Sequence, residues 1–383
     1  MIRFNSTILN QIIQYGKISS FKNKVSKYNS DKGTSKFNCF AILVIMIACQ
    51  FLKRDKLREI QDTFEVNSSC MYHLGLKSVK RSSLADALKV RNQKVFEEHF
   101  YTLLDELKSK DRRKYRKQIK ILDSTTIGLC KTVFEWAAFR STKSGIKIHI
   151  MFDDRLSVPV KAIMTKAKDH DVKIAKRFDI EKNQIYVFDR GYNDYGYFYE
   201  IQKNKAFFIT RLKKNAKHRV LKKKITENKY GVISERIIKI IGTNKDSYNE
   251  PLRLIEYHDE ETKRRFRFVT NNFKMKAQEI ADIYKRRWQI ELFFKWLKGH
   301  FKVKKFLSTS ENGVKIQIWC ALIAYILLML IQKECQINLS TYELLRIIEG
   351  SLFCRINLFE VLKRIKLRRS YDKSSLKEEA YLW

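Results

Sequence analysis

The sequence of 383 residues contains few of the residues that interrupt regular structure or mark secreted proteins. It has 2 Pro and 12 Gly, so we expect long, regular helices and strands. Its 7 Cys are scattered, and no pair has the spacing of a zinc site or a redox motif. An odd number of cysteines without such a pattern is typical of a protein in a reducing cytoplasm.

Long apolar runs and a signal peptide are also missing. The two longest apolar runs, residues 39–52 and 319–331, are shorter than the ~20 residues that a helix needs to cross a bilayer. Both are therefore predicted to be buried helices. The first residues, MIRFNSTILNQIIQ, lack the apolar core and cleavage site of a signal peptide. We expect a cytoplasmic protein with no membrane partner.

Acidic residues are scarce relative to basic ones. The chain has 78 Lys and Arg against 41 Asp and Glu, a formal net charge of +37. Such an excess predicts a polyanionic partner, and double-stranded DNA is the simplest choice. A lysine-rich proteome is the alternative, but it does not explain clustering. Residues 203–224 contain ten Lys or Arg and no acid.

The N-terminal part has the pattern of a helical, basic domain. Apolar residues recur at helical spacing in residues 4–15, 39–52 and 78–107, and residues 53–64 form a further amphipathic segment. A short helix, a turn and a longer helix fit a DNA-binding module, although small basic helical bundles with other roles share this pattern. The basic linker at residues 108–118 ends this part.

The pattern then changes to that of an α/β domain. Strands are expected at residues 119–127, 132–139, 146–153, 184–192 and 206–210, and helices at residues 171–178 and 194–203. This order predicts antiparallel followed by parallel pairing. Further alternating segments in residues 211–268 predict a β-rich insertion, and helical spacing returns at residue 276.

Two carboxylates end apolar strands, and a third lies on a later helix. Asp123 follows IKIL, Asp189 follows IYVF, and Glu291 comes after the insertion. Ligand sites in open α/β sheets gather at the carboxyl ends of strands, so these acids are candidates to bind two divalent metal ions. The simpler alternatives are a helix cap or turn at Asp123 and, for Asp189, an ion pair with Arg190 or a turn before Gly191.

Glu291 belongs to a column of charged residues. On one continuous helix the column would occupy a single face beside an apolar column, and it consists of Tyr284, Arg287, Glu291, Lys295 and Lys298. A face of this kind suits an anionic partner, and a solvated charged face is the alternative.

These residues carry a family resemblance. The segment YKRRWQIELFFKWLK resembles the Tyr-Arg-Glu-Lys signature of a subgroup of insertion-sequence DDE transposases, with Tyr284, Arg287, Glu291 and Lys298 in register. The phrases ILDSTT and VFDRGY resemble the family's two upstream acids. The N-terminal segment is similar to the domain that precedes many of these catalytic domains, so the resemblance covers about residues 4–335.

The resemblance implies an α/β fold with an RNase H-like catalytic core, interrupted by a β-rich insertion and preceded by an all-α N-terminal DNA-binding domain. The expected parts are the DNA-binding domain at 1–110, the core at 118–210 and 269–335, the insertion at 211–268 and a helical, basic C-terminal tail at 336–383. The implied activity is Mg²⁺-dependent cleavage at terminal inverted repeats and strand transfer into target DNA, which is cut-and-paste transposition.

The resemblance also assigns residues. Asp123, Asp189 and Glu291 would be catalytic and would bind two Mg²⁺ ions, for which Mn²⁺ could substitute. The expected DNA-binding residues are Tyr284, Arg287, Trp288, Lys295 and Lys298. A homodimer on DNA, in the bacterial cytoplasm at the nucleoid, is expected.

One departure from the family pattern concerns the hairpin intermediate. Hairpin-forming relatives hold a flipped base with a tryptophan in the insertion, and residues 211–268 contain no Trp. Tyr230, Tyr248 and Tyr257 are the aromatic alternatives, so a hairpin step stays open.

Other polar residues have simpler interpretations. Asp153 and Asp154 are expected in a turn, His149 in packing or a phosphate contact, and Asp169 to Asp171 at a helix cap. Two rival functions remain, a DNA-binding repressor without catalysis and a structure-selective nuclease.

Overall fold

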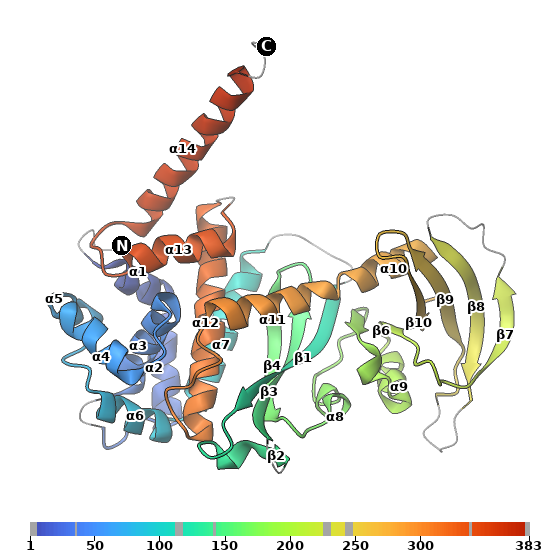
Figure 1. The fold of residues 1–383 in the computed structure, drawn as a ribbon, viewed down its shortest axis with the longest axis horizontal. Coiled ribbons are helices and arrows are strands. Elements are labelled where there is room, and N and C mark those ends of the chain that lie inside the picture. Colours follow the sequence, from blue (N-terminus) through green and yellow to red (C-terminus); the bar gives the residue numbers. More distant parts are fainter. Residues whose placement is uncertain are drawn as a thin grey trace. The chain divides into compact units, whose positions relative to one another are not determined.

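The computed structural model describes residues 6–34, 37–111, 118–140, 143–224, 231–241, 248–336 and 339–379 (Figure 1). The chain divides into two compact units, one formed by residues 1–112 and 296–383 and the other by residues 113–295. The expected second part of the core, residues 269–335, is therefore shared between both units. The assignment of functional domains stays a prediction.

The first unit is helical. Its helices are α1 (Ile8–Tyr15), α2 (Ile18–Lys27), α3 (Cys39–Leu52), α4 (Leu57–Val66), α5 (Ser68–Met71), α6 (Arg81–Val90), α7 (Gln93–Ser109), α12 (Glu311–Cys335), α13 (Thr341–Ser351) and α14 (Leu358–Glu379), with a 3₁₀ turn η1 (Tyr72–Leu74). Side-chain caps begin several of them, such as Asn38 on α3 and Ser310 on α12.

Helix α12 forms the core of this unit and packs against α3, α6 and α7. By length and composition it could cross a membrane, but 89% of its apolar window is buried within the structure. Nearly all of residues 319–331 and of α3 are likewise buried, so the prediction of two buried helices is confirmed. Apolar side chains on every face of α12 are explained by neighbours on every side.

The second unit is built around one 10-stranded sheet. Its strands are β1 (Ile119–Leu129), β2 (Ala138–Arg140), β3 (Lys143–Asp153), β4 (Val158–Lys166), β5 (Ile185–Phe188), β6 (Phe207–Arg211), β7 (His218–Lys224), β8 (Val232–Ile240), β9 (Leu252–Asp259) and β10 (Arg264–Thr270). The spatial order is β2-β3-β1-β5-β6-β10-β9-β8-β7, and β4 pairs with β3.

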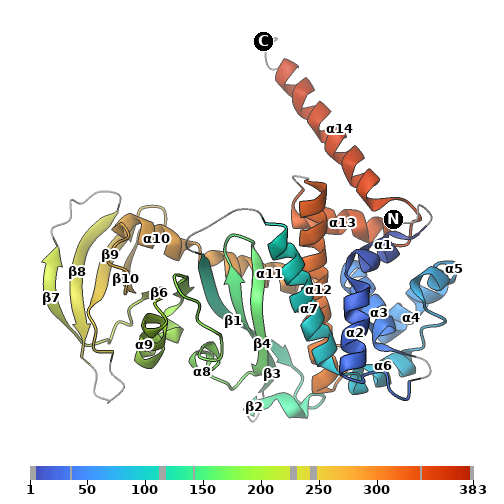
Figure 2. The same ribbon diagram turned by 180° about the vertical axis from the view of Figure 1, so that it is seen from behind.

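Pairing within the sheet follows the predicted sequence of antiparallel and then parallel strands. β1 is antiparallel to β3 and parallel to β5, and β5 is parallel to β6. The helix α9 (Tyr195–Lys203) packs on β6, and α8 (Asp171–Ala175) packs on β1 and β3 (Figure 2). β7 to β10 extend the same sheet through β6, so the segment expected as an insertion continues the sheet.

The expected strand at 132–139 is wrong. Most of this segment forms a turn and the 3₁₀ helix η2 (Glu135–Ala137), and β2 begins only at Ala138. The third antiparallel strand is β4, which contains Pro159. Proline lacks a donor for the strand ladder, and β4 pairs only with β3 among the described strands, which is an edge position that tolerates it.

The single helix expected through residues 284–298 is also wrong. α10 (Ala277–Lys285) ends before the signature arginine, and α11 (Trp288–His300) begins after it. Arg286 and Arg287 form a tight turn in which the amide of Arg287 donates to the carbonyl of Tyr284 at 3.0 Å. Because of this turn, Tyr284 of α10 and the residues of α11 do not belong to one continuous helix with a single charged face.

Candidate active site

Asp123 lies within β1, which continues to Leu129, so it does not end its strand as expected, and Asp189 directly follows the neighbouring parallel strand β5 as the N-cap of the 3₁₀ helix η3 (Arg190–Tyr192). The register between β1 and β5 pairs Leu122 with Phe188, and each aspartate is the next residue in the sequence after this pair. The apolar residues before them fix this register because they are buried in the sheet. The structure therefore brings these two predicted residues together at the carboxyl end of β5.

A single arginine joins Asp123 to Glu291. The Nη1 atom of Arg287 lies 3.5 Å from Oδ2 of Asp123, and its Nη2 atom donates to Oε1 of Glu291 at 2.5 Å. Arg287 can make both contacts because it stands in the turn between α10 and α11, with Glu291 one helical turn later. The positive charge of the Arg287 guanidinium thus lies next to two of the three predicted acids, Asp123 and Glu291.

The environment favours the protonated form of Asp123. Burial raises the pKa of Asp123 to about 6, and the charges of Asp189 and Glu291 add to this effect. The backbone amide of Ser124, which donates to Oδ1 of Asp123 at 2.8 Å, and the charge of Arg287 act in the opposite direction. Because burial outweighs the two stabilising interactions, the ionised form of Asp123 would be stabilised by a further positive charge.

Tyr284 lies close to the same charges. Its ring is buried, with the guanidinium carbon of Arg287 5.8 Å from the ring centroid. Burial raises the pKa of Tyr284, whereas Arg287 and Arg211 lower it. The pKa of Tyr284 is therefore affected by the charges of Arg287, Arg211 and Asp189.

Sequence reasoning missed Arg211. The parallel register of β5 and β6 ends with Val187 opposite Ile209, and Arg211 is the last residue of β6. The Thr210 hydroxyl just before it donates to the backbone carbonyl of Asp189 at 3.2 Å, which brings this end of β6 close to Asp189. Its guanidinium carbon lies 5.1 Å from the ring centroid of Phe266, a cation–π contact that holds the charge at this edge. The available signal was a cation at the end of β6, the strand next to the one that Asp189 follows.

The remaining predicted DNA-binding residues lie on α11. Trp288, the first residue of the helix, is 58% exposed, and Lys295 is exposed. Lys298 is partly buried, and burial together with Lys304 lowers its pKa. Lys298 falls in the helical unit, since the division between units lies at residues 295 and 296. The roles of all these residues stay predictions.

The tyrosines considered for base flipping are not placed for it. Tyr248 is buried and hydrogen-bonds to Gln202, and Tyr257 is buried against Phe268 with Lys285 above its ring. Tyr230 lies outside the described residues. Neither of the two described side chains offers a free face to a base.

Polar residues around the site have structural partners. Asp153 forms a buried ion pair with Lys120 at 2.6 Å and accepts the amides of Arg155 and Leu156, which is the expected turn. The expected helix cap at residues 169–171 is confirmed in position, because His170 is the N-cap of α8, but the His170 side chain makes no capping hydrogen bond. Asp171 lies in the first turn, with its carboxylate 3.3 Å from Nδ1 of His149.

In the part of the chain that the structure describes, no three His, Cys, Asp or Glu side chains lie close enough together to hold one metal ion. In this arrangement the Arg287 guanidinium contacts Asp123 and Glu291.

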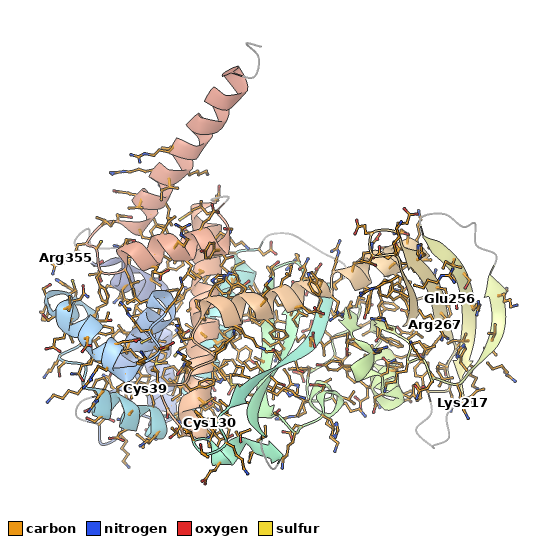
Figure 3. The ribbon with its side chains drawn as sticks, in the orientation of Figure 1. Cys39, Cys130, Lys217, Glu256, Arg267 and Arg355 are labelled. Atoms are coloured by element: carbon orange, nitrogen blue, oxygen red, sulfur yellow. The ribbon has the colours of Figure 1, made fainter. Side chains whose placement is uncertain are left out.

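The basic run at residues 203–224 includes strand β7. Its exposed lysines Lys222 and Lys223 lie opposite Ile237 and Arg236 of β8. Figure 3 labels Lys217, just before β7, and Glu256 and Arg267, which face each other across β9 and β10. Edge strands rich in lysine avoid pairing with other chains, so this charge also has a structural role.

Known proteins resemble this chain over most of its length. The family model described as a transposase DDE domain matches residues 114–327, and a domain of unknown function, DUF4372, matches residues 4–77. A putative transposase, y4zB, of Sinorhizobium fredii is 34% identical over 72% of this chain and 77% of its own length.

Two further relatives come from insertion sequences. A probable transposase for insertion sequence element IS5377 of Geobacillus stearothermophilus is 28% identical over 61% of this chain and 63% of that protein. A putative transposase for insertion sequence element IS4SA of Synechocystis is 28% identical over 76% and 83%.

Among solved structures, a piggyBac transposase synaptic complex with hairpin DNA matches with a TM-score of 0.47 and 9% identity, over 91% of this chain and 79% of that one. This likeness is too distant to bear on the fold or the site. The match to the DDE domain covers more than half of the chain, which confirms the resemblance to insertion-sequence transposases and their role in DNA transposition. The chain belongs to the DDE transposase family and is a DDE transposase.

Proposed function

We propose that this transposase cleaves DNA at terminal inverted repeats in a Mg²⁺-dependent reaction and transfers the 3′ ends into target DNA by cut-and-paste transposition. The observation that carries the proposal is that Asp123 and Asp189 each follow a paired residue of the parallel strands β1 and β5, with Glu291 linked to Asp123 through Arg287. These are the three acids expected to do the chemistry.

The donor set suits two Mg²⁺ ions, with Mn²⁺ as a substitute. Carboxylate oxygens are the ligands that these hard cations prefer. The Arg287 guanidinium stands in for a cation between Asp123 and Glu291, so this pair of acids already neutralises a positive charge. Asp123, Asp189 and Glu291 would hold the metal, which when bound activates the attacking oxygen and stabilises the leaving oxygen of a phosphodiester.

The chain's own cations would hold the DNA. Arg287, which contacts Asp123 and Glu291 in this structure, and Tyr284 would bind the DNA backbone beside the scissile phosphate. Arg211 would contact the neighbouring phosphate, since it follows Thr210, whose hydroxyl donates to the Asp189 carbonyl. Lys295 and Lys298 would follow the backbone along α11, and the exposed ring of Trp288 would stack on a displaced base.

The strand order supports an RNase H-like core. Antiparallel β4, β3 and β1 followed by parallel β5 and β6 form one continuous half of the sheet. β7 to β10 would be the β-rich insertion, because they lie between Asp189 and Glu291 in the sequence. We further propose the Tyr-Arg-Glu-Lys subgroup, DNA binding by residues 1–110, and action as a homodimer on DNA at the bacterial nucleoid.

Cleavage of a DNA fragment that carries the element's own terminal repeats tests the proposal. We expect Mg²⁺-dependent cutting that is lost in Asp123→Ala, Asp189→Ala and Glu291→Ala, while binding to the same DNA persists. Normal cutting by any of the three variants would refute its assignment. Specific binding without cutting in any metal would favour a repressor, and cutting at junctions without preference for the repeats would favour a structure-selective nuclease.

A further inference from the structure

Next to the acids lies a network of hydrogen bonds that the proposed chemistry does not use. Its centre is Asp171, the first residue of α8. The hydroxyl of Ser124 donates to Oδ1 of Asp171 at 2.6 Å, and Nδ1 of His149 lies 3.3 Å from the same oxygen. Lys147 Nζ completes the set at 3.3 Å. A carboxylate with three donors is held in one orientation.

The sheet itself places the donors. Ser124 and His149 are directly opposite each other in the β1–β3 register, and Lys147 lies two residues before His149 on the same face. His149 is 2% exposed, and its Nε2 atom hydrogen-bonds to the Thr165 hydroxyl of β4 at 2.9 Å. The imidazole is therefore fixed at both nitrogens, so it cannot turn away from Asp171.

Ser124 connects this network to the candidate acids. Its backbone amide donates to Oδ1 of Asp123, while its hydroxyl donates its only proton to Asp171. The hydroxyl oxygen can then accept a hydrogen bond from Tyr192, a buried residue of the 3₁₀ helix η3 (Arg190–Tyr192) that follows Asp189. One serine thus links the segments that carry Asp123 and Asp189.

We propose that Asp171 and His149 are positioning residues, which act through Ser124 to hold Asp123 in the orientation that binds metal. The inference rests on the proposed function of Asp123. Asp171 stays ionised in this role: burial raises its pKa, but hydrogen bonds from His149 and Ser124 and the charge of Lys147 outweigh burial and hold the pKa well below its usual range.

Metal affinity tests the proposal without requiring turnover. We would measure Mn²⁺ binding to the full-length protein by titration calorimetry for the wild type, Ser124→Ala, Ser124→Thr, Asp171→Asn and His149→Gln. Removing partners that orient a metal ligand typically costs about 10- to 100-fold in metal affinity. We expect a loss of that size for Ser124→Ala, Asp171→Asn and His149→Gln, and recovery to near the wild-type value for Ser124→Thr, which keeps the hydroxyl.

The matched control is Asp179→Asn, the same chemical change at a side chain that is 87% exposed. It should bind Mn²⁺ like the wild type. Ser124→Ala removes one oxygen only, so it should remain folded, which a thermal unfolding scan checks. Wild-type Mn²⁺ affinity in Ser124→Ala and Asp171→Asn, or equal losses in Ser124→Thr and Ser124→Ala, would overturn the inference. Failure of the wild type to bind Mn²⁺ would instead refute the proposed function.

Discussion

At the scale of single residues, the burial of Asp123 has the largest effect on the ionisation of its carboxyl group. Asp123 is largely buried, and its burial outweighs the help it receives from Arg287 and from the Ser124 amide. Ionised Asp123 therefore destabilises the metal-free protein, and binding of a cation relieves that cost. Relief of this unfavourable charge therefore contributes to the free energy with which the site binds a cation.

This argument predicts how stability depends on pH. The pKa of Asp123 is about 6 in the folded protein against 3.8 in the unfolded chain, so the folded state binds more protons between these values. Metal-free protein should lose stability as the pH rises through this window. Asp123→Asn imitates the protonated acid and should be more stable than the wild type at pH 8, by on the order of 1–3 kcal/mol.

Urea unfolding of both proteins in EDTA at two pH values measures the difference. At a pH near 4, where Asp123 is protonated in the folded state, the two free energies of unfolding should converge. A difference that is equal at both pH values would contradict the assigned ionisation.

Arg211 offers a second test at the same scale. If it contacts a phosphate beside Asp189, Arg211→Ala should lower the rate of DNA cleavage by about 10- to 100-fold, the usual value of a charge-assisted hydrogen bond. Arg177→Ala, which removes an exposed arginine of the same unit, should cut at the wild-type rate. Equal rates for both variants would remove Arg211 from the site.

At the scale of elements, the apolar strand segments before Asp123 and Asp189 were predicted more accurately than the elements around them. Asp123 and Asp189 follow runs of buried β-branched and aromatic residues, a pattern that requires no knowledge of neighbours. β4 was missed because Pro159 is tolerated only at an edge, and edge positions are set by tertiary pairing.

The break between α10 and α11 was missed for a similar reason. Helical spacing continues across residues 284–291, and no Pro or Gly marks the turn. The apolar column expected there is buried, yet the tight turn at Arg286 and Arg287 places Arg287 between two acids. Its contact with Asp123 depends on the fold of distant segments, which local patterns do not report.

The buried helix α3 provides a prediction about the helical unit. It packs against α12, and Val44 in its middle is fully buried. Val44→Ala removes two methyl groups and leaves a cavity, so the free energy of unfolding should fall by about 2 kcal/mol. Val66→Ala makes the same change at the end of α4, where the side chain is 84% exposed, and should have little effect. Equal effects in thermal unfolding would contradict the burial of α3.

At the scale of the whole molecule, the net charge of +37 raises the question of whether total charge or its location controls DNA binding. Binding that releases counterions from 6–10 phosphates would weaken by about 10³- to 10⁵-fold between 50 and 200 mM salt. Total charge alone predicts that any two lysines contribute equally. A contact surface at β7 predicts that its lysines contribute more than others.

Two double variants with the same change in charge separate these possibilities. Lys222→Gln with Lys223→Gln neutralises two exposed lysines of β7, and Lys182→Gln with Lys205→Gln neutralises two exposed lysines that precede β5 and β6. Because each phosphate contact contributes about 0.9 to the slope of log affinity against log salt, the β7 variant should lower that slope by about two. The other variant should leave the slope near its wild-type value. Fluorescence anisotropy with a short duplex over a salt series measures both, and equal slopes would show that β7 makes no local contact.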